Sequence, residues 1–333
     1  MNFVNFEFCE NVINLLTIRK GGVRRMTGLE SKFWDKYASL MCQKVRHYDV
    51  TCYADLEKPQ WKIVVKQLES EEKIPLHEFT KIPRKYICFE RLTVEDGLTD
   101  SDAPLAEGRT KCKESFDDDV LPLIDSFALQ SCVHELIIDT TRTFESEQIL
   151  QRLHKKTFCS TMSLSADEHE TTPFKETFFD FMKDQQLNGN CSSFTLSGWW
   201  PKKVLSWSLD VLKSGNPVVI NMAHPFVDFE VYENIFNWWE NLENPQTLNS
   251  RFSAKVTFDR ERLIQFIDNL EEKETTYMKF LGKRHEKNQN ACVYAILKKN
   301  GIRNRNHQSL KSRHVDLRFG NIRNREYRDV FER

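Results

Sequence analysis

The sequence predicts an α/β fold in which short strands alternate with amphipathic helices. Apolar residues recur at every second position in short runs, and at helical spacing in the segments between those runs. The chain has 333 residues, of which 40% are hydrophobic, so it can bury a sizeable core. Its 48 basic and 49 acidic side chains nearly cancel, which gives no general attraction to nucleic acid or to an anionic membrane surface. We therefore expect neither as a partner.

Residues 1–95 are predicted to form a helical segment followed by a β-hairpin. One stripe of a short first helix is apolar at i, i+4, i+7 and i+8 (Phe8, Val12, Leu15 and Leu16). The period then changes to two in Tyr48–Cys52 and again in Trp61–Val65, and residues 55–60 supply the turn between them. A further strand is predicted over Tyr86–Val94.

Three other segments differ from the rest in composition. Residues 96–119 are rich in Asp and Glu and poor in large apolar residues, which predicts a solvated linker or loop. Residues 276–300 are expected to form closing strands or a cap. Residues 301–333 contain nine Arg or Lys against four acids, and we expect a basic, mobile tail there.

Residues 120–275 are predicted to form a βα repeat-like domain. Strands are expected to start near residues 135, 157, 192, 217 and 252, and a helix follows each of them. Pro201 precedes the third helix and Asp228 the fourth, as helix starts favour. The third and fourth helices are expected to bury the stripes Leu205, Leu209 and Leu212, and Val231, Ile235, Trp238, Trp239 and Leu242, respectively.

Strand and helix at spacings of about 22 to 35 residues fit either a doubly wound sheet or a curved solenoid of the leucine-rich-repeat kind. Two features favour an irregular leucine-rich-repeat-like βα solenoid. The intervals resemble irregular repeats, and no glycine-rich loop follows any predicted strand. A solenoid presents a broad concave face without a catalytic cleft, so this architecture predicts binding.

The chain lacks the motifs of common enzyme classes. We find no G-x-G-x-x-G, no Walker loop, no H-E-x-x-H and no G-x-S-x-G, so we predict no enzymatic activity and no cofactor. The nearest approach to a metal-ligand pattern is His47 with Cys52 on one predicted strand, which is too sparse to predict a metal site.

Nine scattered cysteines suit reduced thiols packed in a core, so we expect the chain in the cytoplasm, or alternatively in the nucleus. The first 16 residues include Glu7 and Glu10 and show no cleavage site, so they do not resemble a secretory signal.

Two tryptophan pairs are candidate contact residues. Trp199 and Trp200 stand at a predicted strand-to-helix turn, and tryptophan is enriched at interaction hot spots, so we consider both as partner-binding anchors. Packing in the core is the alternative for this pair. Trp238 and Trp239 lie on an apolar helical stripe and are expected in the core.

Two stretches of the chain are similar to a nematode-expanded group of F-box-like proteins. The opening MNFVNFEFCENVINLL, followed by Phe33-Trp34 and the Trp61 strand, resembles the N-terminal pattern of that group. The stretch FTLSGWWP at 194–201, with a helix and then Val218–Asn221, resembles its C-terminal half. The resemblance covers most of residues 1–275, through scattered apolar positions. One departure is Asn5, where the family places proline.

This resemblance implies a non-catalytic protein–protein interaction module. Residues 1–95 would be an F-box-like segment that docks a Skp-type subunit of a cullin ubiquitin ligase, and the repeat-like region would select an unknown protein substrate. The docking residues carried over are Phe6, Phe8, Val12, Leu15 and Leu16. The alternative is a plain binding or inhibitor protein that sequesters a protein partner without any ubiquitin ligase.

Overall fold

The computed structural model of the chain describes residues 39–40, 43–54, 60–96, 114–128, 132–139, 143–166, 175–187, 191–267, 271–274, 278–298 and 314–321. The chain forms two compact units. Unit 1 comprises Met1–Ser163 and Lys175–Cys191, and unit 2 comprises Leu164–Phe174 and Ser192–Arg333.

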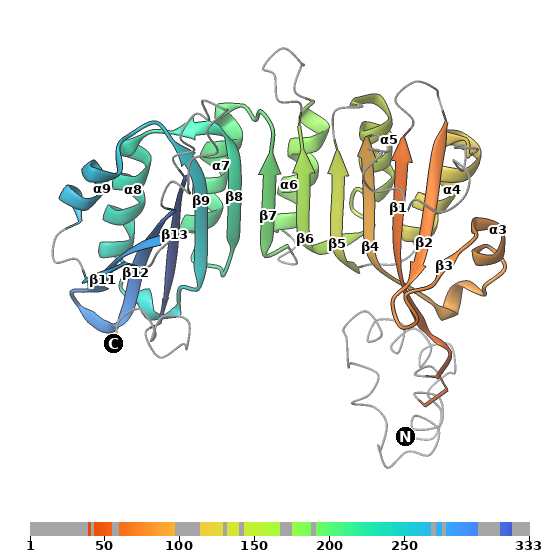
Figure 1. Ribbon diagram of the computed structural model, residues 1–333, viewed down its shortest axis with the longest axis horizontal. Coiled ribbons are helices and arrows are strands. Elements are labelled where there is room, and N and C mark those ends of the chain that lie inside the picture. The colour runs from red at the N-terminus through yellow and green to blue at the C-terminus, as the bar shows by residue number, and fades with distance from the viewer. Residues whose placement is uncertain are drawn as a thin grey trace, which may run out of the picture. The chain divides into compact units, whose positions relative to one another are not determined.

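The sheet of unit 1 has the strand order β6-β5-β4-β1-β2-β3 (Figure 1). Its strands are β1 (Arg46–Ala54), β2 (Trp61–Gln67), β3 (Lys73–Ile74), β4 (Ile87–Asp96), β5 (Cys132–Asp139) and β6 (Phe158–Ser165). β1 and β2 are antiparallel, with Val50 opposite Val65, which confirms the predicted hairpin. β1 also pairs in parallel with β4, and β4 pairs in parallel with β5.

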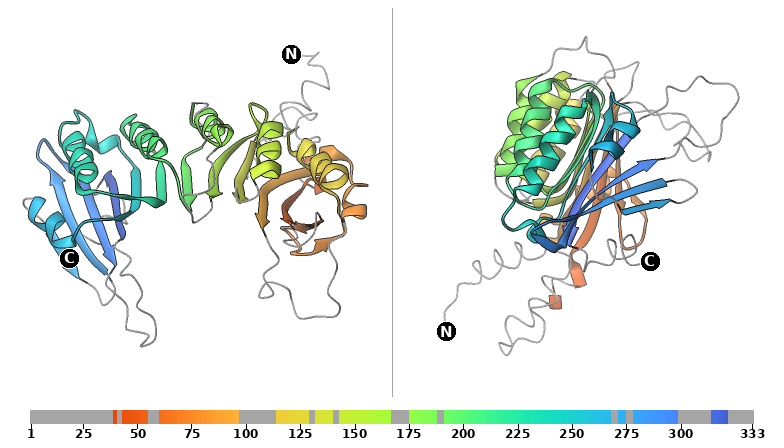
Figure 2. Two further views of the ribbon diagram at one scale, coloured as in Figure 1. Left: turned by 90° about the horizontal axis from the view of Figure 1, so that it is seen from above. Right: turned by 90° about the vertical axis from the view of Figure 1, so that its left-hand side faces the viewer.

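The helices of unit 1 cover one face of this sheet. They are α3 (Leu76–Phe79), α4 (Leu121–Ala128), α5 (Thr143–Leu153) and α6 (Glu176–Leu187), with short 3₁₀ and π turns at η2 (Arg84–Tyr86) and η3 (Phe116–Val120). Figure 2 shows α4, α5 and α6 on the same side of the strands. Phe89 of β4 stacks on Phe127 of α4, with ring centroids 3.7 Å apart, so the core lies between strands and helices.

The π turn η3, which leads directly into α4, begins where the sequence predicted an acidic linker. Ser115 and Asp119 cap its start reciprocally: the Asp118 amide donates to the Ser115 hydroxyl, and the Ser115 amide donates to the Asp119 carboxylate at 2.7 Å. Negative charge at residues 117–119 also suits the positive end of the helix dipole. The acidic run at residues 117–119 therefore lies in the first helical turn, where the Asp119 carboxylate accepts from the Ser115 amide.

The sheet of unit 2 has the strand order β10-β11-β12-β13-β9-β8-β7. Its strands are β7 (Ser193–Ser197), β8 (Val219–Val227), β9 (Ser250–Val256), β10 (Glu271–Glu274), β11 (Met278–His285), β12 (Asn288–Lys298) and β13 (His314–Asn321). Its helices are α7 (Lys202–Lys213), α8 (Phe229–Glu240) and α9 (Arg260–Phe266), with a 3₁₀ turn at η4 (Pro245–Thr247). The strands β7, β8 and β9 are parallel neighbours in chain order. The remaining neighbours in the sheet, from β9–β13 through β13–β12 and β12–β11 to β11–β10, pair antiparallel.

The buried stripes of α7 and α8 differ by about one position from the prediction. In α7, Leu205 and Leu209 are only half-buried, and the residues inside are Val204, Ser208, Val211 and Leu212. In α8 the buried residues are Phe229, Tyr232, Ile235, Phe236 and Trp239. Ser208 is tolerated inside because its hydroxyl donates to the Val204 carbonyl oxygen at 2.8 Å. Counting apolar residues alone missed this position.

The strand β13 lies inside the segment 301–333, for which the sequence predicted a mobile tail. For these eight residues the prediction is wrong. Val315, Leu317 and Phe319 alternate with polar neighbours and are fully buried. The strand fills the space between β9 and β12, and the Tyr232 hydroxyl of α8 donates to its Val315 carbonyl oxygen.

The fold is of the α/β class, as predicted. Strand starts at β5, β6, β7, β8 and β9 agree with the predicted starts to within a few residues. The helices that the structure describes are all too short or too polar to span a lipid bilayer.

Candidate functional site

The sheet of unit 2 has one apolar and one polar face. Phe194, Ile220, Phe252 and Leu317 are aligned across β7, β8, β9 and β13, and all are fully buried. The next row on the opposite face is Thr195, Asn221, Ser253 and Asp316, and the row beside it includes Arg251 and Arg318. Figures 1 and 2 show α7 and α8 on one side of β7, β8 and β9. No described helix of unit 2 covers the other side.

We call these residues, with Lys255 and His314, the polar face of unit 2. It consists of Thr195, Asn221, Arg251, Ser253, Lys255, His314, Asp316 and Arg318.

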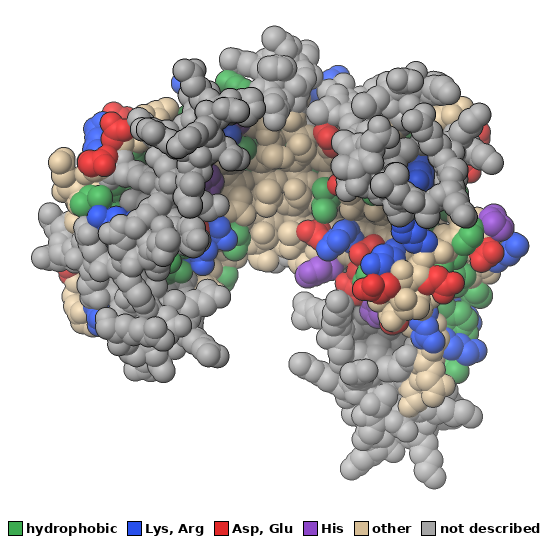
Figure 3. All heavy atoms as spheres, in the orientation of Figure 1, with side chains coloured by type: hydrophobic (Ala, Val, Ile, Leu, Met, Phe, Trp, Pro, Cys, Tyr) green, Lys and Arg blue, Asp and Glu red, His purple; other side chains and the backbone are tan. Residues whose placement is uncertain are grey.

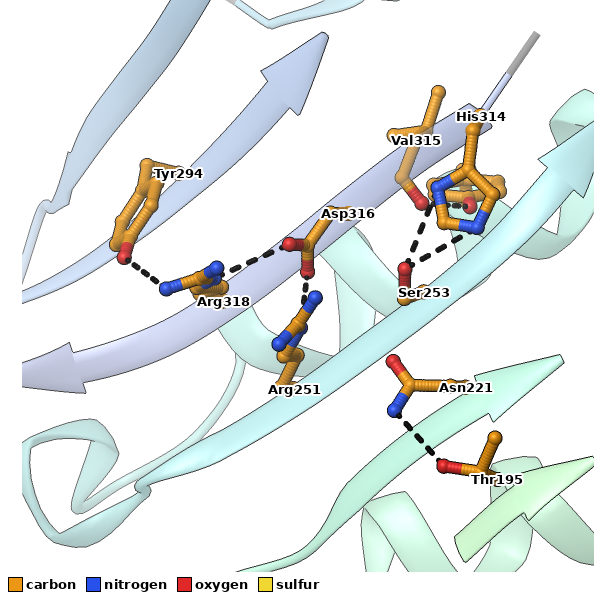
Figure 4. A network of polar contacts seen from close by, with 10 residues as sticks. Thr195, Asn221, Arg251, Ser253, Tyr294, His314, Val315, Asp316 and Arg318 are labelled. Carbon is orange, nitrogen blue, oxygen red and sulfur yellow. Dashed lines mark hydrogen bonds and ion pairs between the residues drawn. The ribbon is translucent and has the colours of Figure 1, made fainter. Parts of the chain in front are cut away.

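A network of polar contacts holds this face in place (Figure 4). The Asp316 carboxylate accepts from Arg251 Nε at 2.8 Å and from Arg318 Nε at 3.2 Å. Arg318 Nη1 also donates to the Tyr294 hydroxyl at 3.4 Å. Burial by itself would lower the pKa of Arg318, but the neighbouring Asp316 charge raises it above its usual value. One carboxylate thus orients two guanidinium groups on adjacent strands.

The polar face of unit 2 carries an excess of positive charge. Arg251, Lys255 and Arg318 stand against the single carboxylate of Asp316. Lys255 Nζ lies 3.4 Å from His224 Nε2 and 6.0 Å from the ring centroid of Phe226. Ser253 and Asp316 are buried, and Arg251, Lys255 and Arg318 are half-buried. Because the charged side chains that reach solvent on this face are basic, the face suits an acidic surface on a partner.

Phe226 is the exposed aromatic side chain next to this face. It is 52% exposed, and it lies where the register of β8 against β9 shifts between Met222 and Val227. Its ring packs edge-on against His224, with centroids 4.8 Å apart. An exposed aromatic ring beside cationic side chains is the composition of an interface hot spot. Phe226 was not singled out in the sequence.

The tryptophans have different positions from those proposed. Trp200 is fully buried, and its indole nitrogen donates to the Ser197 carbonyl oxygen at 2.8 Å, so it packs in the core and is not an exposed anchor. Trp199 is half-buried. Trp239 is buried as expected, and Trp238 is half-buried. The docking residues Phe6, Phe8, Val12, Leu15 and Leu16 lie outside the described residues.

The sheet of unit 1 also has a charged face. Asp49, Arg91 and Glu135 are aligned on β1, β4 and β5. Arg91 Nε lies 2.5 Å from the Glu135 carboxylate, and its Nη1 lies 3.7 Å from that of Asp49. Burial raises the pKa of Asp49, and the Arg91 charge opposes this. Figure 3 shows acidic and basic side chains intermixed in this region.

Three potential metal ligands meet on the same strands. His47, Cys88 and Glu90 each offer one ligand atom, and these atoms lie within 4.8 Å of one another. His47 Nδ1 is 2.6 Å from Glu90 Oε1, and hydrogen bonds to Cys88 and to Glu90 raise the pKa of His47 to about 10. Cys52, the partner considered from the sequence, is fully buried. It lies on the opposite face of β1 from His47, so the two side chains cannot share a metal ion. The pairing of β1 with β4 brings Cys88 and Glu90 to His47, and spacing along the chain cannot show this.

Unit 1 also contains a cleft of about 270 Å³ between α3, η2 and α4. It is lined mostly by apolar side chains, with Arg84, Asp118 and Asp119 among the polar ones. Arg84 donates to the carbonyl oxygens of Ile87 and Ser126, which occupies part of its guanidinium group. The volume lies just below the roughly 300–1,000 Å³ typical of small-molecule sites, so we do not assign a ligand to it.

Comparison with known proteins adds no further identification. No family model matches the chain, and neither a curated protein nor a solved structure is significantly similar to it.

Proposed function

We propose that the chain is a non-catalytic protein-binding module that contacts its partner through the polar face of unit 2. The observation that supports this is the alignment of polar side chains across β7, β8, β9 and β13, opposite the helices. Half-buried Arg251 and Arg318 supply charge complementarity, and exposed Phe226 supplies an aromatic anchor that a bound partner would desolvate.

We also propose that the βα units form an irregular solenoid of the leucine-rich-repeat kind. Parallel neighbours in chain order, as in β7, β8 and β9, are consistent with it, and so are helices on one face within each unit. The antiparallel pairs among β9 to β13 depart from a regular repeat and would close the stack at one end. In such a protein the strand face is the natural binding surface.

The specific role that we propose is a substrate-recognition adaptor of a Skp-cullin ubiquitin ligase. The support is the resemblance of residues 1–16 and 194–201 to the nematode-expanded F-box-like group. In this role residues 1–95 dock the Skp-type subunit, and unit 2 selects the protein to be modified. A binding protein that only sequesters its partner uses the same polar face but needs no Skp-type subunit.

The first experiment mixes the purified full-length chain with a purified Skp-type subunit and tests for co-elution. We expect a complex with the unmodified chain and none with Phe8→Glu or Val12→Glu. Circular dichroism of each variant must show that it remains folded. Absence of a complex with the unmodified chain excludes the adaptor role and leaves the sequestering protein.

The second experiment tests the polar face by affinity capture and quantitative mass spectrometry. Lys255→Glu and Phe226→Ala change the proposed surface, while Lys202→Glu makes the same charge change on an exposed position of α7. We expect proteins captured by the unmodified chain and by Lys202→Glu to be lost with the two face variants. Capture that is unchanged in Lys255→Glu and Phe226→Ala, or lost only in Lys202→Glu, contradicts the proposed surface.

A further inference from the structure

We propose that His47, Cys88 and Glu90 form a zinc-binding site that joins β1 to β4. The ligand atoms of the three side chains lie within 4.8 Å of one another, although Cys88 and Glu90 are more than forty positions from His47 in the sequence. Among the described residues, this is the one group of at least three such side chains with metal-ligand spacing. Its residues belong to unit 1, whereas those of the proposed protein-binding surface belong to unit 2.

The donor set selects the metal. One imidazole nitrogen, one thiolate sulfur and one carboxylate oxygen are all ligands that Zn²⁺ accepts, whereas Mg²⁺ and Ca²⁺ prefer oxygen ligands throughout. Cu⁺ favours softer sets that are richer in sulfur. Three protein ligands leave the fourth position of a tetrahedral zinc ion for water or another donor.

The backbone holds the three residues in a defined arrangement. His47 and Cys88 are direct neighbours in the parallel pairing of β1 with β4. The register then shifts, so that Tyr48 pairs with Phe89 but Asp49 pairs with Arg91, and Glu90 is the extra residue. Cys88 and Glu90 are two positions apart in β4, so both lie on the face of the sheet that carries His47, and Glu90 Oε1 lies 2.6 Å from His47 Nδ1.

Neighbouring contacts fix the start of β1 at the same place. The His47 amide donates to the Glu69 carboxylate at 3.1 Å, and the His47 carbonyl oxygen accepts from the Leu68 amide at 2.9 Å. β1 is paired on both sides, with β2 and with β4. The ligands therefore come from interior strands, whose positions change little when a metal binds.

Binding of a zinc ion would require the His47 and Glu90 side chains to move slightly apart. His47 Nδ1 and Glu90 Oε1 are 2.6 Å apart, which is a hydrogen-bond distance. Two ligands of one tetrahedral zinc ion at bond lengths of about 2.0–2.2 Å stand roughly 3.4 Å apart. The His47 nitrogen and the Glu90 oxygen would therefore have to move apart by somewhat less than about 1 Å, which a small side-chain rotation can provide. The side chain of His47 is 25% exposed and that of Glu90 10% exposed, so an ion from solvent has a route to the site.

The test is a titration of the full-length chain with Co²⁺ and then with Zn²⁺. Bound Co²⁺ reports a thiolate ligand by a sulfur-to-cobalt charge-transfer band, and tetrahedral geometry by intense visible bands. We expect this spectrum at one equivalent of Co²⁺ and its loss when Zn²⁺ is added. Zn²⁺ should also raise the melting temperature of the unmodified chain, because it binds only the folded site.

Variants assign the band to these residues. Cys88→Ser should abolish the charge-transfer band, and His47→Asn and Glu90→Gln should weaken Co²⁺ binding by at least about tenfold. The matched control is His77→Asn, an exposed histidine of the same unit whose side chain is 72% exposed, which should leave the titration unchanged. Thermal melts show which variants fold.

The proposal is overturned if the unmodified chain shows no thiolate-to-cobalt band at micromolar protein and equimolar metal. It is also overturned if the band persists in folded Cys88→Ser, since the thiolate then comes from another cysteine. The titration of the unmodified chain does not depend on any variant, so it remains decisive if a substitution prevents folding.

Discussion

At the scale of single residues, Asp316 is the charge on which the polar face of unit 2 depends. Its carboxylate is 10% exposed and lies between Arg251 and Arg318. Asp316→Asn turns an amide nitrogen toward at least one guanidinium donor, so we expect unfolding free energy to fall by about 1–3 kcal/mol. This is below the roughly 3–5 kcal/mol for a fully buried pair, because Arg251 is 36% exposed. Urea titration measures the loss.

The control for this prediction is Asp180→Asn. Asp180 pairs with Lys183 one helical turn away, and the two side chains are 58% and 41% exposed, respectively. Exposed pairs of this kind contribute at most about 0.5 kcal/mol, so the same chemical change should have little effect there. Equal losses in the two variants would mean that Asp316 is not a special position.

Cys52 gives a second prediction at the residue scale. Its side chain is fully buried, and burial raises the pKa of its thiol to about 12. At pH 8 only about one thiol in ten thousand is then ionised, and the thiolate is the form that reacts. We expect iodoacetamide to leave Cys52 unmodified in the native chain and to alkylate it in urea, as peptide mass spectrometry can show. Rapid native alkylation would contradict the burial of β1.

At the scale of elements, sequence periodicity predicted most strands and helices, but not their long-range pairing. The strands β5 to β9 and the hairpin β1–β2 were predicted because their alternation is local. The parallel pairing of β1 with β4, which brings Cys88 to His47, joins segments about forty residues apart. No spacing rule reports such a contact. The same limit applies to β13, whose partner β9 is about sixty residues upstream.

Helix registers show a different limit. The stripe of α7 was shifted because Ser208 is buried through its own hydrogen bond, while Leu205 and Leu209 lie at the edge of the buried face. Likewise, Trp200 and Trp199 are adjacent and chemically identical, yet only Trp200 has the Ser197 carbonyl oxygen as an acceptor inside. Burial of a polar or amphipathic residue depends on such partners, which composition cannot indicate.

The strand β13 gives the prediction at this scale. Val315, Leu317 and Phe319 are fully buried, and each contributes about 1.5–3 kcal/mol by burial. Their sum is comparable to the roughly 5–15 kcal/mol stability of a domain. A chain that ends at residue 300 should therefore lose protection from hydrogen exchange at β9 and β12, which flank β13. A chain that ends at residue 321 retains β13 and should keep that protection. Equal protection in both chains would contradict a structural role for β13.

At the scale of the whole molecule, the proposed binding function depends on a local charge excess in a chain that is nearly neutral. The formal net charge is -1, yet Arg251, Lys255 and Arg318 outnumber Asp316 on the polar face of unit 2. Net charge led to the expectation of no general electrostatic attraction, and it carries no information on how charges are arranged on one sheet. The arrangement follows from strand register, in which residues on four strands become neighbours.

The affinity for the partner recovered by capture should therefore depend on salt. Raising the salt concentration from about 0.1 to 0.5 M shortens the Debye length from about 10 Å to between 3 and 8 Å, so the dissociation constant should rise several-fold. Lys255→Glu should weaken binding at low salt and flatten this dependence, whereas Lys202→Glu on α7 should preserve it. Titration calorimetry at several salt concentrations measures both slopes. A slope that is the same for the unmodified chain and for Lys255→Glu would place the contact surface elsewhere, because a charge at the interface must alter the electrostatic part of binding.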